Sequence, residues 1–329
     1  MLRILFVALA FLALPVSSYA QSNERSDAIL KAWQNWVSSN RVGKSTIAIT
    51  YRGKLVMAEG HRMDASKPAP LASLSKAITA VCVNSLFAAG RVFPETKLAE
   101  IFGANLEALK INAPKSSEIT LSQLISQSSG LARDTTQRDM GRWVGNRKVR
   151  HLDVAKKALK RGPSKSGRYF YNNENYAILG AVIEKVTGTK YADYCSRAVL
   201  RPAGIKTARL SRKWGAFAAW GGWEMSASDY AKFLKYAFGR NSAIGKKPTA
   251  YPRVFLGRGA YYGMGTLFRA SGNSFNFWHA GRHCFSQGGA GAFYASWNGD
   301  WAVVVTYNKC LKDNAVGNLD TALANAALR

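Results

Sequence analysis

The chain has 329 residues, of which 47% are hydrophobic and 20% are charged. This composition excludes a disordered or collagen-like protein, because the apolar fraction is ordinary and neither Gly nor Pro is enriched. The 46 Lys and Arg against 19 Asp and Glu give a formal net charge of +27. On its own, that charge predicts a polyanionic partner such as nucleic acid, a membrane surface or an acidic cell-wall polymer.

The first twenty residues have the layout of a secretory signal peptide. Arg3 gives a positive start, residues 4–15 are an apolar run, and Ser18 and Ala20 are the small residues of a cleavage site before Gln21. The run is shorter than a membrane-spanning helix, and no Cys stands at the cut to take a lipid. We expect a periplasmic or secreted protein, whose net charge is +26 once Arg3 is removed with the signal peptide. Such a protein does not meet nucleic acid. The alternative is that the segment stays uncleaved as an anchor.

Apolar spacing and turn residues predict secondary structure at both ends of the chain. The expected elements are a helix over 26–37, a hairpin with strands 46–51 and 55–58, a second hairpin with strands 291–297 and 301–307, and a closing helix over 319–328. The second hairpin turns at Asn298-Gly299, the strongest short hairpin signal. Helical patterns fill the middle. We therefore predict an α+β fold, an antiparallel sheet from both chain ends packed against terminal helices, with a largely helical insertion.

Four cysteines, Cys82, Cys195, Cys284 and Cys310, stand in a compartment that permits disulfides. Their spacing matches no zinc site, because no two of them lie within a few residues of each other. Four cysteines allow three pairings, and the sequence does not choose among them. We favour Cys284 with Cys310, since both follow strands of the same predicted sheet. Cys82 lies inside an apolar helix and is interpreted as a buried thiol.

A basic segment, defined as residues 133–168, holds twelve Lys or Arg against three Asp, a net charge of +9. Charge runs of this kind are commonly solvated faces. The alternative is a functional patch that acts on an anionic substrate. Both interpretations stay open at this point.

The sequence Ser73-Leu74-Ser75-Lys76 precedes an apolar helical pattern that stops at Gly90. Ser73 is thus at a helix start, and Lys76 lies one turn further on the same face. A serine hydroxyl is a weak nucleophile until a base takes its proton, and a desolvated amine within hydrogen-bond reach can do so. The helix N-terminus adds a positive potential for an oxyanion. The alternative is a simple helix cap with Lys76 in water.

Two further motifs follow in the chain, Tyr171-Asn172-Asn173 before a helix and His279-Ala280-Gly281-Arg282 before the C-terminal hairpin. Ser-x-x-Lys, Tyr-x-Asn and His-x-Gly, in that order, resemble the motifs of the serine β-lactamase and penicillin-binding-protein superfamily. The closest resemblance is to the class C branch, which also contains D,D-carboxypeptidases, D-amino-acid amidases and esterases. Further matching segments are 122–131, 175–180, 202–205, 221–233 and 262–265.

The resemblance implies one hydrolase domain over 21–329, whose α/β part covers about 21–95 and 255–329 and whose helical part covers about 96–254. Ser73 would attack a carbonyl and form an acyl-enzyme. Lys76 and Tyr171 would carry the proton, with Tyr171 as the base if Lys76 lowers its pKa.

The substrate-binding residues implied by the resemblance come from the second and third motifs. Asn173 would hold the substrate amide, and His279 would line the cleft. The backbone N–H groups of Ser73 and Arg282 would form the oxyanion hole, with Gly281 allowing close approach. No metal and no organic cofactor is implied, and we expect a monomer.

The third motif departs from the Lys-Thr-Gly of typical β-lactamases, because His279 and Ala280 replace the cation and the hydroxyl that seat a substrate carboxylate. We expect Arg282 or the basic segment to supply a replacement cation. The predicted function is an exported serine hydrolase acting on cell-wall peptides or small amides and esters. The alternatives are a true β-lactamase and a catalytically silent protein that binds anionic envelope polymer.

Overall fold

The computed structural model describes residues 16–164 and 167–328, without the side chains of residues 16–22. The predicted signal peptide therefore lies mostly outside the described residues, and its cleavage point falls within the first helix, α1 (Val16–Ser39). None of the described helices is long and apolar enough to cross a membrane.

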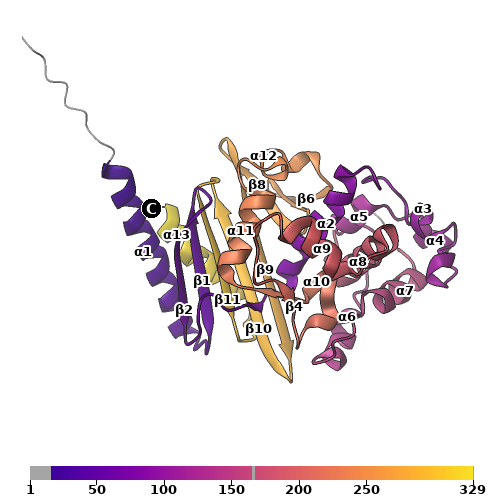
Figure 1. Cartoon of the computed structure of the whole chain (residues 1–329), viewed down its shortest axis with the longest axis horizontal. Helices are drawn as coiled ribbons and strands as arrows, with labels where there is room; N and C mark the ends of the chain where they lie inside the picture. Colours follow the sequence, from indigo (N-terminus) through magenta and orange to yellow (C-terminus); the bar gives the residue numbers. More distant parts are fainter. Residues whose placement is uncertain (1–15, 165–166, 329) are drawn as a thin grey trace, which may run out of the picture.

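An eight-stranded antiparallel sheet, in the order β2-β1-β11-β10-β9-β8-β7-β6, forms the centre of the molecule (Figure 1). Strands from the two chain ends are direct neighbours, because β1 pairs with β11 from Ser45↔Tyr307 to Tyr51↔Trp301. The strands are β1 (Ser45–Tyr51), β2 (Lys54–His61), β6 (Arg253–Gly257), β7 (Ala260–Gly263), β8 (Thr266–Ser271), β9 (Ser274–Phe285), β10 (Gly288–Trp297) and β11 (Trp301–Tyr307). The predicted sheet from both ends is confirmed.

Both predicted hairpins are present, and each turns through two residues in the left-handed region. Arg52 and Gly53 have φ of 48° and 71°, and Asn298 and Gly299 have φ of 55° and 68°. Two consecutive positive φ values match the right-handed twist of the flanking strands, which is why Asn-Gly favours this turn. The strands are longer than predicted, since β2 extends to His61 and β10 begins at Gly288.

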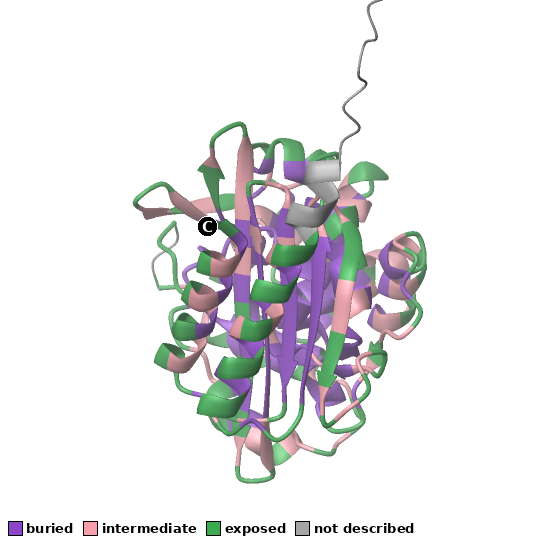
Figure 2. Ribbon diagram, turned by 90° about the vertical axis from the view of Figure 1, so that its left-hand side faces the viewer, coloured by how far each residue is buried: buried purple, intermediate pink, exposed green. Residues whose placement is uncertain are grey.

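One face of the sheet is covered by the terminal helices α1 and α13 (Asp313–Leu328), which lie side by side over it (Figures 1 and 2). Alternate strand residues face this side and are buried, among them Ile47, Phe293 and Val305. The period of two places their neighbours on the opposite face. Both predicted terminal helices are confirmed, and α13 begins six residues earlier than the apolar spacing indicated.

The opposite face packs against the helical region between the chain ends (Figure 1). Its α-helices are α2 (Ser75–Ala88), α3 (Leu98–Phe102), α4 (Pro114–Ser117), α5 (Leu121–Ile125), α6 (Thr136–Asp139), α7 (His151–Arg161), α8 (Asn173–Thr187), α9 (Tyr191–Cys195), α10 (Ala218–Gly221), α11 (Ala227–Phe238) and α12 (Ala243–Lys246). Its short helical turns are η1 (Ala72–Leu74), η2 (Glu107–Leu109), η3 (Met140–Trp143), η4 (Ser196–Leu200), η5 (Gly215–Phe217) and η6 (Pro248–Ala250). Helix α2 is buried along most of its length.

A second, three-stranded sheet joins the segment before α2 to the segment after α10. It consists of β3 (Ala69–Pro70), β5 (Trp223–Met225) and β4 (Arg209–Leu210), in the order β3-β5-β4. The Leu71 N–H also donates to the Trp223 carbonyl at 2.9 Å. These bonds fix the chain just before Ser73 against the chain just after Trp220.

Two disulfides close the fold, and one of them corrects the sequence prediction. Cys284 pairs with Cys310, as favoured, with 5.0 Å between the Cα atoms. Cys82 is not a free buried thiol, because it pairs with Cys195 across 113 residues of chain at a Cα separation of 5.4 Å. The helical spacing of α2 showed that Cys82 is buried, but only the packing of α9 against α2 places Cys195 beside it.

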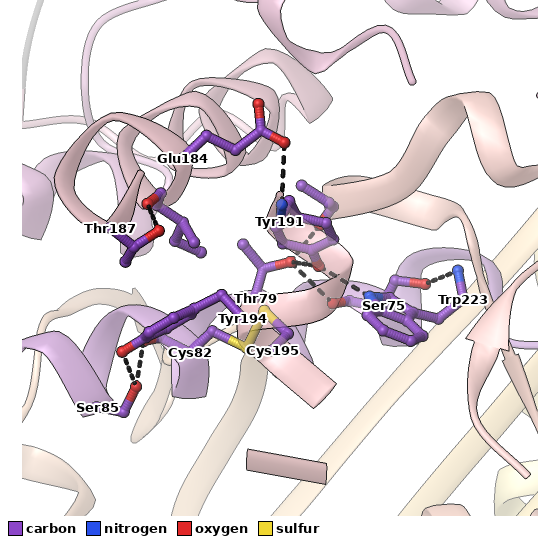
Figure 3. The surroundings of a disulfide bond; sticks show 12 residues. Ser75, Thr79, Cys82, Ser85, Glu184, Thr187, Tyr191, Tyr194, Cys195 and Trp223 are labelled. Carbon is purple, nitrogen blue, oxygen red and sulfur yellow. Dashed lines mark hydrogen bonds between the residues drawn. A yellow bond between two sulfur atoms is a disulfide. The ribbon is translucent and has the colours of Figure 1, made fainter. Parts of the chain in front are cut away.

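The Cys82–Cys195 bridge lies beside a buried polar cluster that holds α2 in place (Figure 3). The Thr79 and Tyr191 hydroxyls are 2.6 Å apart, and the Trp223 indole N–H donates to the Tyr191 oxygen at 2.8 Å. All three residues are buried, so each of these polar groups needs a partner inside the protein. The cluster and the disulfide together anchor the helix that carries Lys76.

We predict that replacing Cys82 and Cys195 together by Ala destabilises the protein, because the open chain regains conformational freedom on unfolding. Chain-entropy arithmetic gives about 5 kcal/mol for this bridge and about 3.5 kcal/mol for Cys284–Cys310. Urea unfolding of the two double-Ala variants measures both losses. Four free thiols in a titration of the denatured wild type, or an unchanged urea midpoint, would refute the structural role of the bridges.

Candidate active site

Ser73 lies in the short turn η1, which continues directly into α2, as the Ser-x-x-Lys pattern predicted. The preceding residue, Ala72, has φ of 47°, in the left-handed region that non-glycine residues rarely occupy. This sharp backbone turn sits between β3 and α2. Ser73 is half-buried, whereas Lys76, one turn on, is fully buried.

The Lys76 ammonium is held by three acceptors from three parts of the chain. Its Nζ donates to Ser73 Oγ at 3.1 Å, to Asn173 Oδ1 at 2.7 Å and to the Trp220 carbonyl at 2.9 Å. An ammonium has three protons to donate, so this set satisfies it completely. All three acceptors are formally neutral, and the charge is therefore hydrogen-bonded without an ion-pair partner.

Burial lowers the pKa of Lys76 to about 7, and the negative charge of Asp134 opposes that shift. Desolvation disfavours the charged form of a lysine, and it outweighs the more distant carboxylate here. Near neutral pH a large fraction of Lys76 is then an uncharged amine, 3.1 Å from the serine oxygen. A neutral amine in this position can accept the proton of the Ser73 hydroxyl.

Tyr171 stands beside the same serine, but its electrostatics differ from the expectation. Burial raises the pKa of Tyr171, and a hydrogen bond with Ser73 only partly offsets that rise. The Lys76 Nζ lies 4.9 Å from the centroid of the tyrosine ring, so the cation faces the π-system. The condition under which Tyr171 would be the base, a pKa lowered by Lys76, is therefore not met, and burial keeps the phenol protonated near neutral pH.

Asn173 begins α8 and is directed inward. Its Oδ1 accepts from Lys76, its Nδ2 donates to Thr136 Oγ1 at 2.9 Å, and its backbone N–H donates to Asp134 Oδ2 at 3.3 Å. Both ends of the side-chain amide are used within the protein, and the residue is buried. In this arrangement Asn173 orients Lys76, whereas we had expected it to hold the substrate amide.

Strand β9 forms the wall opposite α2 and brings His279 and Gly281 to the site. Its pairing with β8 ends at Leu267↔Trp278, while its pairing with β10 continues to Phe285↔Gly288. The strand edge from His279 onward therefore faces the helical region instead of another strand. A Cβ on Gly281 would lie 2.5 Å from the Ser73 nitrogen, so only glycine permits this approach.

His279 is buried in an aromatic cluster and is uncharged near neutral pH. Its ring centroid lies 6.0 Å from that of Tyr171 and 6.1 Å from that of Tyr262. Burial, aided by the positive charge of Lys76, lowers the pKa of His279 to about 3. The histidine thus does not replace the cation of a Lys-Thr-Gly motif.

The side chain of Arg282 lies on the other face of the sheet, which corrects its predicted role as a replacement cation. Its Nη1 donates to Asp313 Oδ1 at 2.7 Å and to the Leu311 carbonyl at 3.3 Å. Side chains alternate along a strand, so the residue after Gly281 faces α13. The predicted use of its backbone N–H in an oxyanion hole is independent of this orientation and stays a prediction.

Two contributors around the Gly221-Gly222 pair were not predicted from the sequence. The carbonyl of Trp220 is a direct acceptor of Lys76. His283, on the same face of β9 as His279, has its Nε2 2.9 Å from the Gly221 carbonyl and stacks on Trp214 at 4.7 Å. In the sequence, the Gly221-Gly222 pair was the signal that the backbone is closely packed here. The structure shows why, because a Cβ on Gly222 would lie 2.3 Å from the Ala218 nitrogen.

The basic segment borders the site, and some of its cations neutralise two buried carboxylates. Asp139 is buried and binds Arg138, Arg142 and Lys157. Glu174, the residue after Asn173, is buried and pairs with Arg161. Among the residues that the structure describes, Arg147, Lys148, Lys160 and Arg168 form no ion pair and are exposed.

Within residues 16–164 and 167–328, no three His, Cys, Asp or Glu side chains converge as a metal site would require. The reactive side chains that the structure brings together are those of Ser73, Lys76 and Tyr171.

Two proteins of Staphylococcus aureus are similar to parts of this chain. Protein flp of Staphylococcus aureus is 28% identical over 193 residues, 55% of this chain and 37% of that protein. The match therefore spans little more than a third of that relative. The teichoic acid D-alanine hydrolase of S. aureus is 38% identical over 81 residues, 24% of this chain and 18% of that protein.

A solved structure supports the fold over almost the whole chain. The D-amino acid amidase from Ochrobactrum anthropi SV3 superposes with a TM-score of 0.71 at 18% identity, covering 90% of this chain and 99% of that one. At this identity the likeness concerns the fold. The β-lactamase family model matches residues 38–327, which is most of the chain, and the protein belongs to the β-lactamase family.

Proposed function

We propose that this protein is an exported serine hydrolase that cleaves an ester or amide bond to a D-amino acid of envelope material through an acyl-enzyme on Ser73. The observation that carries the proposal is the buried Lys76, whose Nζ lies 3.1 Å from Ser73 Oγ and whose pKa is lowered to about 7. A solvated lysine would be almost wholly protonated at neutral pH and unable to act as a base.

In the first step, Ser73 Oγ attacks the carbonyl carbon while its proton passes to the neutral Lys76 amine. The bond from that carbon to the leaving oxygen or nitrogen then breaks, and the leaving group takes a proton from Lys76 directly or through the Tyr171 phenol. In the second step, water attacks the acyl carbon while Lys76 takes one of its protons. The bond from that carbon to Ser73 Oγ then breaks, and Oγ takes the proton back from Lys76, which releases the acid and restores the free serine. Asn173 and the Trp220 carbonyl keep the amine aimed at Ser73 throughout.

The negative charge of each tetrahedral intermediate would be held by the backbone N–H groups of Ser73 and Arg282. Preorganised N–H donors of this kind stabilise a transition state more than a ground state. The close approach at Gly281, where a Cβ would lie 2.5 Å from the Ser73 nitrogen, supports this role, because it lets the two backbone segments converge on one oxygen.

The third motif supports small D-aminoacyl esters or amides ahead of penicillins. The neutral His279 and the Ala280 side chain offer neither the cation nor the hydroxyl that seats a β-lactam carboxylate, and Arg282 points to the far face. The names of the two similar proteins, a teichoic acid D-alanine hydrolase and a D-amino acid amidase, agree with that class. Export through the predicted signal peptide would bring the protein to such substrates.

We predict that a fluorescent fluorophosphonate labels the wild-type protein once, at Ser73, and that Ser73→Ala abolishes the label. The exposed Ser39→Ala, at the end of α1, is the matched control and should label like wild type. Intact-protein mass spectrometry measures the adduct. An unlabelled but folded wild type would favour a silent binder, and a label that persists in Ser73→Ala would place the nucleophile elsewhere.

Turnover of a D-alanyl ester, a D-amino acid amide, a D-Ala-D-Ala peptide and nitrocefin then separates the enzymatic alternatives. We expect the ester or the amide to be hydrolysed fastest. Nitrocefin as the best substrate would make the protein a true β-lactamase and overturn the preference derived from the third motif.

The rate of Ser73 acylation should rise with pH through about 7, because only the deprotonated Lys76 accepts the serine proton. Lys76→Met should lower that rate by about 10²–10⁴-fold and remove the rise. Asp134→Asn should move the midpoint to lower pH, since Asp134 raises the pKa of Lys76; Asp193→Asn, an exposed carboxylate on α9, is the control. Stopped-flow labelling across pH measures each profile, and a midpoint at or above pH 9 would contradict the assignment.

We also propose that the free cations of the basic segment attract an anionic substrate. Arg147→Glu and Arg168→Glu should reduce kcat/KM toward a D-alanylated anionic polymer and weaken its salt dependence, while stability changes by less than about 0.5 kcal/mol. Lys54→Glu, exposed on β2, is the control with the same charge change. Unaltered kinetics across salt concentrations in both variants would leave the segment a solvated face.

A further inference from the structure

A cavity of about 670 Å³ lies between α11 and the sheet, apart from the Ser73 site. Its walls come from α11, from β9, β10 and β11, and from the turn that joins the last two strands. None of Ser73, Lys76, Tyr171, Asn173 and His279 lines it. Its volume is within the range of pockets that bind small molecules.

The inner wall of the cavity is aromatic and already packed. Phe238, Phe277 and Tyr294 are buried there, and the rings of Phe238 and Phe277 are 5.3 Å apart. The Tyr294 hydroxyl is bonded to Thr266 Oγ1, so its polar atom is satisfied and its ring presents an apolar surface. Phe275 and Tyr236 continue this surface toward the solvent. A wall of this kind favours an alkyl chain over a hydrated polar group.

The mouth of the cavity is positively charged. Four exposed cations, Arg52, Lys232, Lys235 and Arg240, line it together with a single carboxylate, Asp300. That carboxylate is engaged by Arg52 at 3.2 Å and lies 3.7 Å from Arg240. Because Lys232 is also paired with Asp229, which stands just outside the lining, the charged groups at the mouth sum to +2.

Lys235 is the cation best placed to meet a ligand. Within residues 16–164 and 167–328 its ammonium has no ion-pair or hydrogen-bond partner, whereas Lys232 is paired with Asp229 at 2.7 Å. Its aliphatic stem lies against the turn at Gly53, where a Cβ would be 3.1 Å from Lys235 Cδ. This contact holds the stem over the mouth and leaves the ammonium free.

We propose that this cavity is a second ligand site, which binds a single-chain alkyl phosphate. The alkyl chain would lie along the aromatic wall, and the phosphate would meet Lys235 and Arg240 at the mouth. A phosphate monoester has close to two negative charges at neutral pH and several strong acceptor oxygens, which suits a mouth with two excess cations. The site needs no chemistry at Ser73 and stands apart from the proposed hydrolase function.

The sheet register places this site beside the catalytic wall, on the same face of the sheet. Tyr294 is the partner of His279 between β10 and β9, and Phe277 is two residues before His279 on the same face. Binding of the alkyl phosphate must therefore be measured directly, both with Ser73 free and with Ser73 blocked by a fluorophosphonate. A ligand in the cavity should bind equally well in both cases.

The test is isothermal titration calorimetry with dodecyl phosphate below its critical micelle concentration. We expect one molecule to bind per chain, at least tenfold more tightly than inorganic phosphate or dodecyl maltoside, which offer only the head charge or only the chain. Lys235→Gln with Arg240→Gln should weaken binding at least tenfold. Lys246→Gln combined with Lys247→Gln, which removes two exposed cations that do not line the cavity, is the matched control and should not.

A cavity-filling variant tests the apolar wall. Ala302→Phe adds a ring at a half-exposed lining position of β11 and should abolish binding while the melting temperature is kept. Three results would overturn the proposal. They are dodecyl phosphate binding that survives Ala302→Phe, equally tight binding of dodecyl maltoside, and no binding of dodecyl phosphate at all. Binding lost after fluorophosphonate treatment of wild type would also overturn it, because the ligand would then occupy the Ser73 cleft. Ser73→Ala should bind like wild type whether or not the hydrolase proposal holds.

Discussion

The burial of one ammonium group, that of Lys76, is the constraint on which the site depends. A buried lysine without an ion-pair partner is costly unless each proton has an acceptor, and here the acceptors are Ser73 Oγ, Asn173 Oδ1 and the Trp220 carbonyl. These belong to η1, the start of α8 and α10. These three elements therefore have to meet around the Lys76 ammonium. The burial that destabilises the charged lysine also lowers its pKa and so makes it a base near neutral pH.

The sheet supplies the other half of the cleft, and glycine decides how closely the halves meet. Pairing of β1 with β11 joins the two chain ends, so β9, late in the sequence, stands beside η1, early in the sequence. Gly281 lets the strand approach the Ser73 nitrogen. Behind α2, the Cys82–Cys195 bridge and the Thr79–Tyr191 hydrogen bond resist any retreat of the helix from the strand. Preorganisation of Ser73 thus rests on packing from both sides.

Local signals predicted much of this from the sequence, and tertiary contacts account for the rest. Asn298-Gly299 predicted its hairpin because the turn geometry is local, and Ser-x-x-Lys placed Ser73 and Lys76 because one helical turn is local. The partner of Cys82, the Trp220 carbonyl and the desolvation of Tyr171 all depend on segments distant in sequence. The orientation of Arg282 could have been predicted from the sequence. Side chains alternate along a strand, so if Gly281 faces Ser73, the side chain of Arg282 points to the opposite face of the sheet.

The most direct test of this account is the ionisation of Lys76 itself, independent of any substrate. Protein labelled with ¹³C at lysine Cε gives one NMR signal per lysine, and the signal absent from Lys76→Met identifies this residue. The account predicts that the signal titrates near pH 7, far below the other lysines. A Lys76 that titrates above pH 10 with the exposed lysines would show that the ammonium stays charged in the site, and would contradict its role as the base.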